Sequence, residues 1–181
     1  NFMHSRGEVR SFLQSAANYW LSVYHVDGIR MDAISRIIYW QGEPARGVNN
    51  NAVDFIREMN RGLKTLHPTV MLSAEDSTSF EGVTKPADQG GLGFDYKWDM
   101  GWMNDTLHYM QCDFPWRPGN HSLLTFSIMY AFSENFILPL SHDEVVNGKC
   151  SLIGRMPGDD WRRFAGLRTL AFYQMTHPGA K

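Results

Sequence analysis

The sequence has few cysteines and no long hydrophobic run, and both absences limit what the protein can be. Its two cysteines, Cys112 and Cys150, lack metal-ligand spacing, so we expect neither a disulfide scaffold nor a metal–thiolate site. No segment has the apolar length of a membrane span or the pattern of a secretory signal. These features predict a protein of a reducing, cytoplasmic setting with no membrane partner.

The chain also lacks a large excess of positive or negative charge, whereas aromatic residues are plentiful. Seventeen Lys and Arg against 19 Asp and Glu give a formal net charge of −2 without a basic run. Nucleic-acid-binding proteins carry clustered positive charge, so we expect no nucleic acid partner. Aromatic residues make up 13% of the chain. Most should fill a core, and some could stack on the apolar faces of sugar rings; composition leaves that choice open.

The spacing of apolar residues predicts short strands that alternate with amphipathic helices. The expected helices span residues 8–24, 52–66, 100–110, 121–132 and 161–175, and the expected strands span 28–33, 69–74, 92–96 and 135–140. Asn49 and its neighbours suit the start of the second helix, and Pro68 ends it. The order is typical of a parallel sheet covered by helices, either doubly wound or a (β/α)8 barrel. The absence of a Gly-x-Gly-x-x-Gly turn disfavours dinucleotide binding.

Three of the expected strands carry carboxylates at their C-terminal ends. Asp32 lies near the end of the first and shares a strand face with Arg30, Glu75 follows the second, and His142 and Asp143 follow the last. Active sites of parallel α/β folds lie at the carboxyl ends of the strands. Three such acids, one beside an Arg and one beside a His, are better explained by a site than by chance.

Three other interpretations of these carboxylates remain open from the residues alone. Arg30 and Asp32 could form a structural ion pair inside the sheet, and any single acid could cap a helix. A cluster of carboxylates could also hold Mg²⁺ or Mn²⁺ in a metal-dependent hydrolase. Glycoside chemistry fits the residue types best, since it needs one acid to protonate the leaving oxygen and one carboxylate at the sugar centre.

Three segments resemble motifs of the α-amylase superfamily, glycoside hydrolase family thirteen. Residues 27–33 (DGIRMDA) resemble its fourth-strand motif, residues 74–78 (AEDST) its fifth and residues 140–144 (LSHDE) its seventh. Residues 91–103 (GLGFDYKWDMGWM) resemble the sixth-strand segment of bacterial glycogen branching enzymes. The likeness implies an α/β fold in which residues 1–181 form part of a catalytic (β/α)8 barrel, roughly strands four to seven.

The resemblance also implies a role for each strand-end residue. Asp32 would be the nucleophile, Glu75 the general acid/base and Asp143 a second carboxylate that binds sugar hydroxyls. Arg30 would keep Asp32 ionised, and His142 would bind the sugar at the cleavage point. A retaining mechanism needs carboxyl groups about 5–5.5 Å apart, which we expect for Asp32 and Glu75.

The implied activity is transfer of α-1,4-glucan chains to form α-1,6 branches, with no cofactor and no metal. A hydrolase of the same superfamily, acting on the same glucans, and a non-catalytic glucan-binding relative are the alternatives. Tyr39 and Trp40, which follow the Asp32 strand, are the first candidates for a sugar-stacking platform. The third- and eighth-strand motifs of the family are not in this sequence, so we expect little or no activity from the isolated chain.

Overall fold

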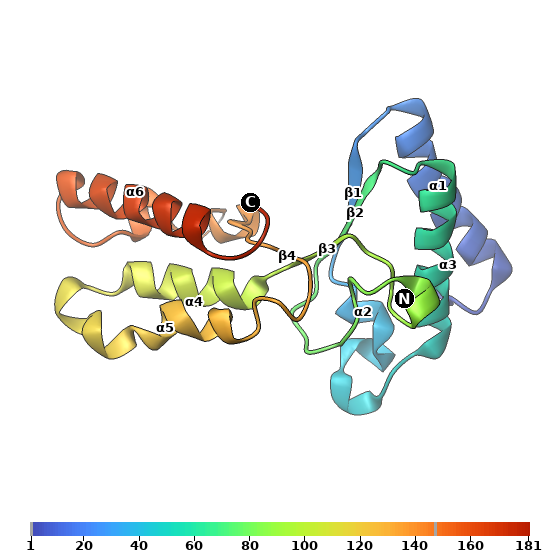
Figure 1. The fold of residues 1–181 in the computed structure, drawn as a ribbon, viewed down its shortest axis with the longest axis horizontal. Coiled ribbons are helices and arrows are strands. Elements are labelled where there is room, and N and C mark those ends of the chain that lie inside the picture. The colour runs from blue at the N-terminus through green and yellow to red at the C-terminus, as the bar shows by residue number, and fades with distance from the viewer. Residues whose placement is uncertain (1, 147) are drawn as a thin grey trace. The chain divides into compact units, whose positions relative to one another are not determined.

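The computed structural model describes residues 2–146 and 148–181, and its contacts divide the chain into two compact units, Asn1–Trp98 and Asp99–Lys181. Figure 1 shows the order of helices and strands along the chain. Across the described residues, no helix is both long and apolar enough to cross a membrane.

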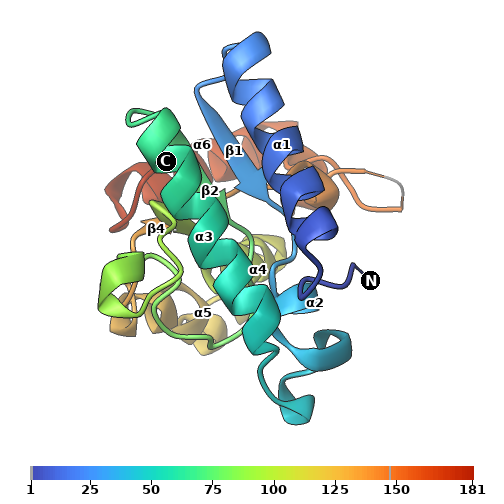
Figure 2. The same cartoon turned by 90° about the vertical axis from the view of Figure 1, so that its right-hand side faces the viewer.

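The first unit is a parallel sheet covered by helices. Its strands are β1 (Gly28–Met31), β2 (Met71–Ala74) and β3 (Tyr96–Trp98), and its helices are α1 (Gly7–Val23), α2 (Ser35–Ile38), α3 (Asn50–Leu66), η1 (Trp40–Gly42), η2 (Pro44–Arg46) and η3 (Ala87–Gln89). β2 lies between β1 and β3 and runs parallel to both. Figure 2 shows α1 and α3 side by side. The strand–helix–strand order expected from the sequence is confirmed.

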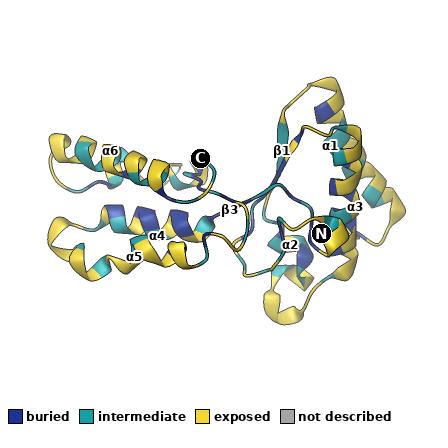
Figure 3. Cartoon of the chain, in the orientation of Figure 1, coloured by how far each residue is buried: buried dark blue, intermediate teal, exposed yellow. Residues whose placement is uncertain are grey.

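The apolar stripe of α3 explains why this helix covers the sheet. Phe55, Ile56 and Leu63 all lie on the buried side of α3, with Ile56 and Leu63 about two helical turns apart. They pack in one hydrophobic cluster with strand residues such as Leu72. Figure 3 shows buried and exposed residues alternating along α3. Asn49 stands at the start of the helix, but its side chain caps no amide, and its Oδ1 is buried without a hydrogen-bond partner among the described residues. The predicted Asn cap is therefore wrong at this position.

The third strand begins later than the sequence predicts. Residues 92–94 pair with the preceding loop: Leu92 N–H donates to the Gly82 carbonyl at 2.9 Å, and Phe94 N–H donates to the Val83 carbonyl at 3.2 Å. Between them Gly93 has a φ of +79°, a conformation that suits glycine and interrupts a strand. Leu92 and Phe94 enter the core as loop residues, so the sheet gains its third strand only at Tyr96.

The second unit packs two longer helices, α4 and α6, and several short elements around its own core. Its elements are α4 (Met100–Gln111), η4 (Phe114–Trp116), η5 (Pro118–Asn120), α5 (Ser122–Thr125), η6 (Phe126–Met129), β4 (Phe136–Ile137), η7 (His142–Glu144), η8 (Ile153–Arg155) and α6 (Asp160–Thr176). Trp102 and Met103 of α4 and Leu170 of α6 are buried in one cluster with Leu138. Asp99 caps α4 by accepting from the Trp102 amide at 2.8 Å.

Two predictions for the second unit need correction. The helix expected over residues 121–132 is a four-residue α-turn followed by a 3-10 turn, and the apolar side chains of its second half, such as Phe132, are exposed. This segment therefore lacks the single buried apolar stripe that a long amphipathic helix would have. The strand expected over 135–140 is two residues long, since Pro139 has no amide hydrogen to extend a ladder. Cys112 and Cys150 are both free, as expected.

Candidate active site

Two neighbouring strands bring the first pair of carboxylates together. β1 and β2 are parallel, with Met31 paired to Ala74, so Asp32 and Glu75 leave the sheet at the same edge. The Glu75 amide donates to the Met31 carbonyl at 2.9 Å, and the Ile34 amide donates to the Glu75 carbonyl at 2.9 Å. These main-chain bonds fix the two strand ends against each other.

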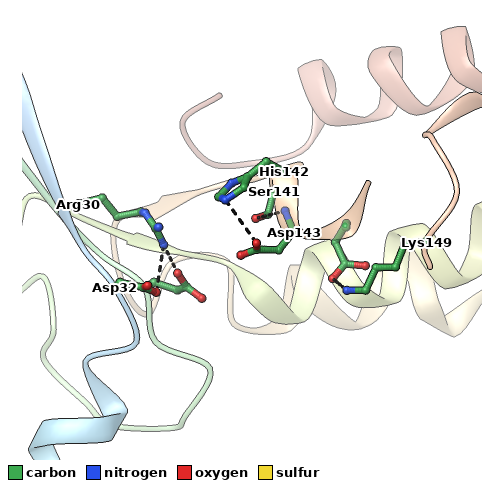
Figure 4. A network of polar contacts seen from close by, with 8 residues as sticks. Arg30, Asp32, Ser141, His142, Asp143 and Lys149 are labelled. Atoms are coloured by element: carbon green, nitrogen blue, oxygen red, sulfur yellow. Dashed lines mark hydrogen bonds and ion pairs between the residues drawn. The ribbon is translucent and has the colours of Figure 1, made fainter. Parts of the chain in front are cut away.

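One guanidinium joins both acids. Arg30 Nη1 lies 3.4 Å from Asp32 Oδ1 and also donates to Glu75 Oε2. Figure 4 shows the Arg30 side chain reaching toward Asp32. The Asp32 side chain is 72% exposed and that of Glu75 is 18% exposed. The pair is therefore at an open end of the sheet, which disfavours a structural ion pair inside it.

The surroundings of Glu75 favour its protonated form. Partial burial is the main cause that raises the pKa of Glu75, and the hydrogen bond and negative charge of the adjacent Asp32 carboxylate raise it further. The Arg30 cation opposes this change but does not cancel it. Glu75 thus keeps a proton to higher pH than an ordinary glutamate, whereas the exposed Asp32 faces a cation. This is the division of roles expected of an acid and a nucleophile.

A buried ion pair holds the segment that follows Glu75. Asp76 Oδ2 lies 2.9 Å from Lys97 Nζ, and the two side chains are 0% and 7% exposed. Asp76 also accepts from the Thr78 amide at 3.1 Å and from its hydroxyl at 2.9 Å, and Lys97 donates to the Thr78 carbonyl at 3.0 Å. Every charge in this cluster is paired or hydrogen-bonded, which a buried ion pair requires.

The predicted residues of the second unit form a cluster of their own. His142 Nε2 lies 3.3 Å from Asp143 Oδ1, both side chains are exposed, and Ser141 Oγ accepts from the Asp143 amide at 3.2 Å. Figure 4 shows the His142 ring and the Asp143 carboxylate facing each other. His142 and Asp143 belong to η7, the next element after β4 along the chain, and Ser141 is its N-cap residue.

A second set of contacts braces η7. Glu144 Oε1 lies 2.7 Å from Lys149 Nζ and Glu144 Oε2 lies 3.1 Å from Arg155 Nη2, which also donates to the Glu144 carbonyl. The hydrogen bond from Lys149 is the main cause that lowers the pKa of Glu144. Glu144 therefore stays ionised and ties the residues after Asp143 to η8.

The structure brings the first three predicted residues together and the last two together. Arg30, Asp32 and Glu75 touch within the first unit, and His142 touches Asp143 within the second. The approach of Asp143 to the other acids stays a prediction, as does the 5–5.5 Å separation of Asp32 and Glu75.

The two predicted aromatic residues differ in surroundings. Tyr39 packs partly buried against the first core, with its ring centroid 6.1 Å from that of Phe80 in an edge-on arrangement. Trp40 begins η1 and is 50% exposed. Trp40 therefore offers the free ring surface that sugar stacking requires, and most of the Tyr39 ring serves packing. Sugar binding by either residue stays a prediction.

Sequence reasoning missed the partners that hold the site. Lys97 and Trp98 of β3 contact Asp76 and Arg30, respectively, and Arg155 contacts Glu144. The one available signal was a lysine between two aromatic residues, Tyr96 and Trp98, at the end of the expected strand, because a lysine in such apolar surroundings needs a partner. Within residues 2–146 and 148–181, no three His, Cys, Asp or Glu side chains gather in a way that could hold a metal ion.

Comparisons with known proteins show what the chain is similar to. No family model matches the chain. It is 53% identical, over 99% of its length, to the 1,4-alpha-glucan branching enzyme GlgB of Desulfitobacterium hafniense (strain Y51), and 51% identical over its whole length to GlgB of Bacillus cereus (strain B4264). The chain spans 30% and 28% of these relatives.

A solved structure shows the fold to which the chain is similar. An Anoxybacillus alpha-amylase superposes with a TM-score of 0.58 at 18% identity, over 99% of this chain and 35% of that one. The chain therefore has the α/β fold of an α-amylase segment, which confirms the expected part of a (β/α)8 barrel.

Proposed function

Because the chain is homologous over its whole length to a segment of 1,4-alpha-glucan branching enzymes, we propose that the full-length protein that carries it branches α-1,4-glucans. The observation that carries the proposal is the contact of one guanidinium, that of Arg30, with two carboxylates on neighbouring strand ends. The substrate would be a glycogen- or starch-like chain, and the reaction would need no cofactor. Such an enzyme would work in the cytoplasm, where its two free cysteines would stay reduced.

In this proposal Asp32 is the nucleophile. Its side chain is exposed and lies beside the Arg30 cation, so it can reach a ligand. Asp32 Oδ attacks the anomeric carbon of an internal α-1,4 link, and the bond from that carbon to the departing oxygen breaks. The product is a glucan chain esterified to Asp32, as a retaining double displacement requires.

Glu75 supplies and takes back the proton. Its raised pKa keeps it protonated for the first step, in which it gives its proton to the departing 4-oxygen. The resulting carboxylate then accepts the proton of a 6-hydroxyl on another glucose unit. That oxygen attacks the anomeric carbon, the bond from this carbon to the Asp32 oxygen breaks, Asp32 leaves as a carboxylate, and an α-1,6 link forms. The number of glycosidic bonds does not change.

The second cluster would bind the sugar. His142 and Asp143 are exposed, with His142 Nε2 3.3 Å from Asp143 Oδ1, and both can pair with hydroxyl groups. Trp40 would provide a stacking surface and Tyr39 a smaller one. These assignments rest on the family likeness of residues 140–144 and on the exposure of the side chains.

Product analysis of amylose treated with the full-length protein tests the proposal. We expect new α-1,6 proton signals without growth of reducing ends. Growth of reducing ends without new branches would show a hydrolase of the same superfamily, and binding without either product would show a glucan-binding relative.

Substitution of the nucleophile separates catalysis from folding. Asp32→Asn should lower the branching rate more than about 1,000-fold, because the amide cannot form the ester. The matched control is Asp54→Asn, which changes an exposed acid of α3 that pairs with Arg57 three residues on, and it should keep its activity. Full activity of Asp32→Asn would contradict the assignment.

A further inference from the structure

We propose that Trp98 is a positioning residue that holds the Arg30 guanidinium against Asp32 and Glu75. The inference rests on the function proposed above and adds to it a residue that acts through Arg30. It starts from the packing of the guanidinium on the aromatic ring, with Arg30 Cζ 4.5 Å from the Trp98 ring centroid.

The position of Trp98 follows from the register of the sheet. Ala74 pairs with Lys97, so Trp98 stands at the level of Glu75, one step beyond the last paired residue. Successive side chains of a strand point to opposite faces. Lys97 therefore points to the buried Asp76, and Trp98 lies on the other face with Arg30. β3 thus contacts this part of the sheet from both faces. Lys97 pairs with Asp76 on one face, and Trp98 packs against Arg30 on the other.

The ring restrains a side chain that few other contacts hold. Arg30 touches the acids through the single atom Nη1, and its long side chain would otherwise sample several rotamers. A ring at this distance attracts a guanidinium through its quadrupole and gives it a flat surface to lie on. Without the ring, the cation would spend less time between the acids.

The placement of Trp98 disfavours a simpler role as a sugar platform. One face of the ring is occupied by the guanidinium, and the residue is partly buried. A platform and a positioning residue also differ in kinetics. Loss of a platform raises KM, whereas loss of positioning lowers kcat and changes the ionisation of the groups that Arg30 faces.

The pH profile gives the sharpest readout. The charged groups that face Glu75 are Asp32, which favours the protonated form, and Arg30, which opposes it. If Arg30 is held less firmly, the opposing effect weakens and the pKa of Glu75 rises further. The descending alkaline limb of kcat should then move to higher pH.

The experiment compares Trp98→Leu and Trp98→Phe in the full-length protein, with activity on amylose followed as a function of pH. Trp98→Leu should lower kcat about 2- to 30-fold, the range set by cation–π strength, and move the alkaline limb upward. Trp98→Phe should recover most of both effects, because it keeps a ring face. Phe114→Leu, which removes a ring under Arg117 at 5.0 Å, is the matched control and should change neither.

A double-mutant cycle tests whether Trp98 acts through Arg30. In an Arg30→Ala background, Trp98→Leu should cause no further loss of kcat. Additive losses, or a rise in KM with an unchanged pH profile, would overturn the inference. If Trp98→Leu does not fold, Trp98→Met, which also lacks a ring, decides by the same criterion: an upward shift of the limb supports the inference and an unchanged limb overturns it.

The outcome is independent of which reaction the wild type performs. A wild-type protein that hydrolyses amylose without branching would contradict the proposed function. The effect of Trp98 on the pH profile would still be measurable on that hydrolysis, so the two failures can be told apart.

Discussion

At the scale of single residues, Glu75 gives the clearest link between protonation and the stability of the fold. Its pKa is raised by partial burial and by Asp32, so the folded protein holds this proton more tightly than the unfolded chain does. Below the unfolded pKa this preference adds to stability. The contribution is lost as the pH rises through the folded pKa, where the buried side chain must ionise. The ionised form needed in the second half of the reaction therefore costs stability.

Replacement of Glu75 tests the direction of this pH dependence of stability. Glu75→Gln removes the ionisation, so its thermal midpoint relative to wild type should be higher at pH 8 than at pH 4. Thermal unfolding of both full-length proteins at the two pH values checks the prediction. A relative midpoint that falls between pH 4 and pH 8 would contradict it.

The alkaline limb of activity depends on the same proton. With Glu75 protonated at low pH and ionised at high pH, kcat should fall as the pH rises through its raised pKa. Glu75→Gln should abolish that limb together with most of the activity on amylose. If the alkaline limb persists unchanged in the residual activity of Glu75→Gln, the group that titrates there is not Glu75.

At the scale of elements, β3 shows where sequence reasoning works and where it fails. The positions of Asp32 and Glu75 were predictable, because short apolar runs mark strands and parallel strands end at one edge. The start of β3 was not, because Leu92 and Phe94 are as apolar as strand residues but enter the core from a loop. The partners of Lys97 and Trp98 were also not predictable, since each lies at least 19 residues away in the sequence.

The Asp76–Lys97 pair makes a second element-level prediction. Lys97→Met would leave a buried carboxylate without its cation, which costs about 3–5 kcal/mol in comparable cases. The double variant Lys97→Met with Asp76→Asn should recover much of that loss, because Asn keeps acceptors and a donor near Thr78 without a charge. Urea unfolding of the full-length proteins measures both.

The control for this prediction is an exposed ion pair of the same unit. Arg46 Nε lies 2.6 Å from Glu43 Oε2 at the surface, so Arg46→Met should change stability by less than about 1 kcal/mol. If Lys97→Met costs no more than Arg46→Met, the buried pair does not hold the Glu75 segment.

At the scale of the whole chain, several large apolar side chains are exposed. In the first unit they include Phe12 and Trp20 of α1, and in the second Trp161 and Phe172 of α6. Exposed apolar surfaces of this kind usually contact another part of a protein or a partner. The 28–30% share of the relatives that the chain spans is consistent with further contacts in a longer protein.

The isolated chain should therefore behave differently from the full-length protein. We expect it to bind a hydrophobic dye, to self-associate and to show little or no activity on amylose. Dye fluorescence and size-exclusion chromatography check the first two expectations, and branch analysis checks the third. Branching by the isolated chain at the full-length rate would contradict this prediction.

The central claim is that Asp32 forms the bond to the sugar while the adjacent Glu75 handles the proton. It is tested most directly by treating the full-length Glu75→Gln variant with an α-glucosyl fluoride. Fluoride leaves without a proton, so the ester can form, and the missing base slows its transfer. Trypsin releases Asp32 in the peptide 31–36 (MDAISR), where it is the only carboxylic side chain. Mass spectrometry should find one added glucosyl unit on that peptide; an adduct on the peptide that carries Asp143, or on no peptide, would contradict the account.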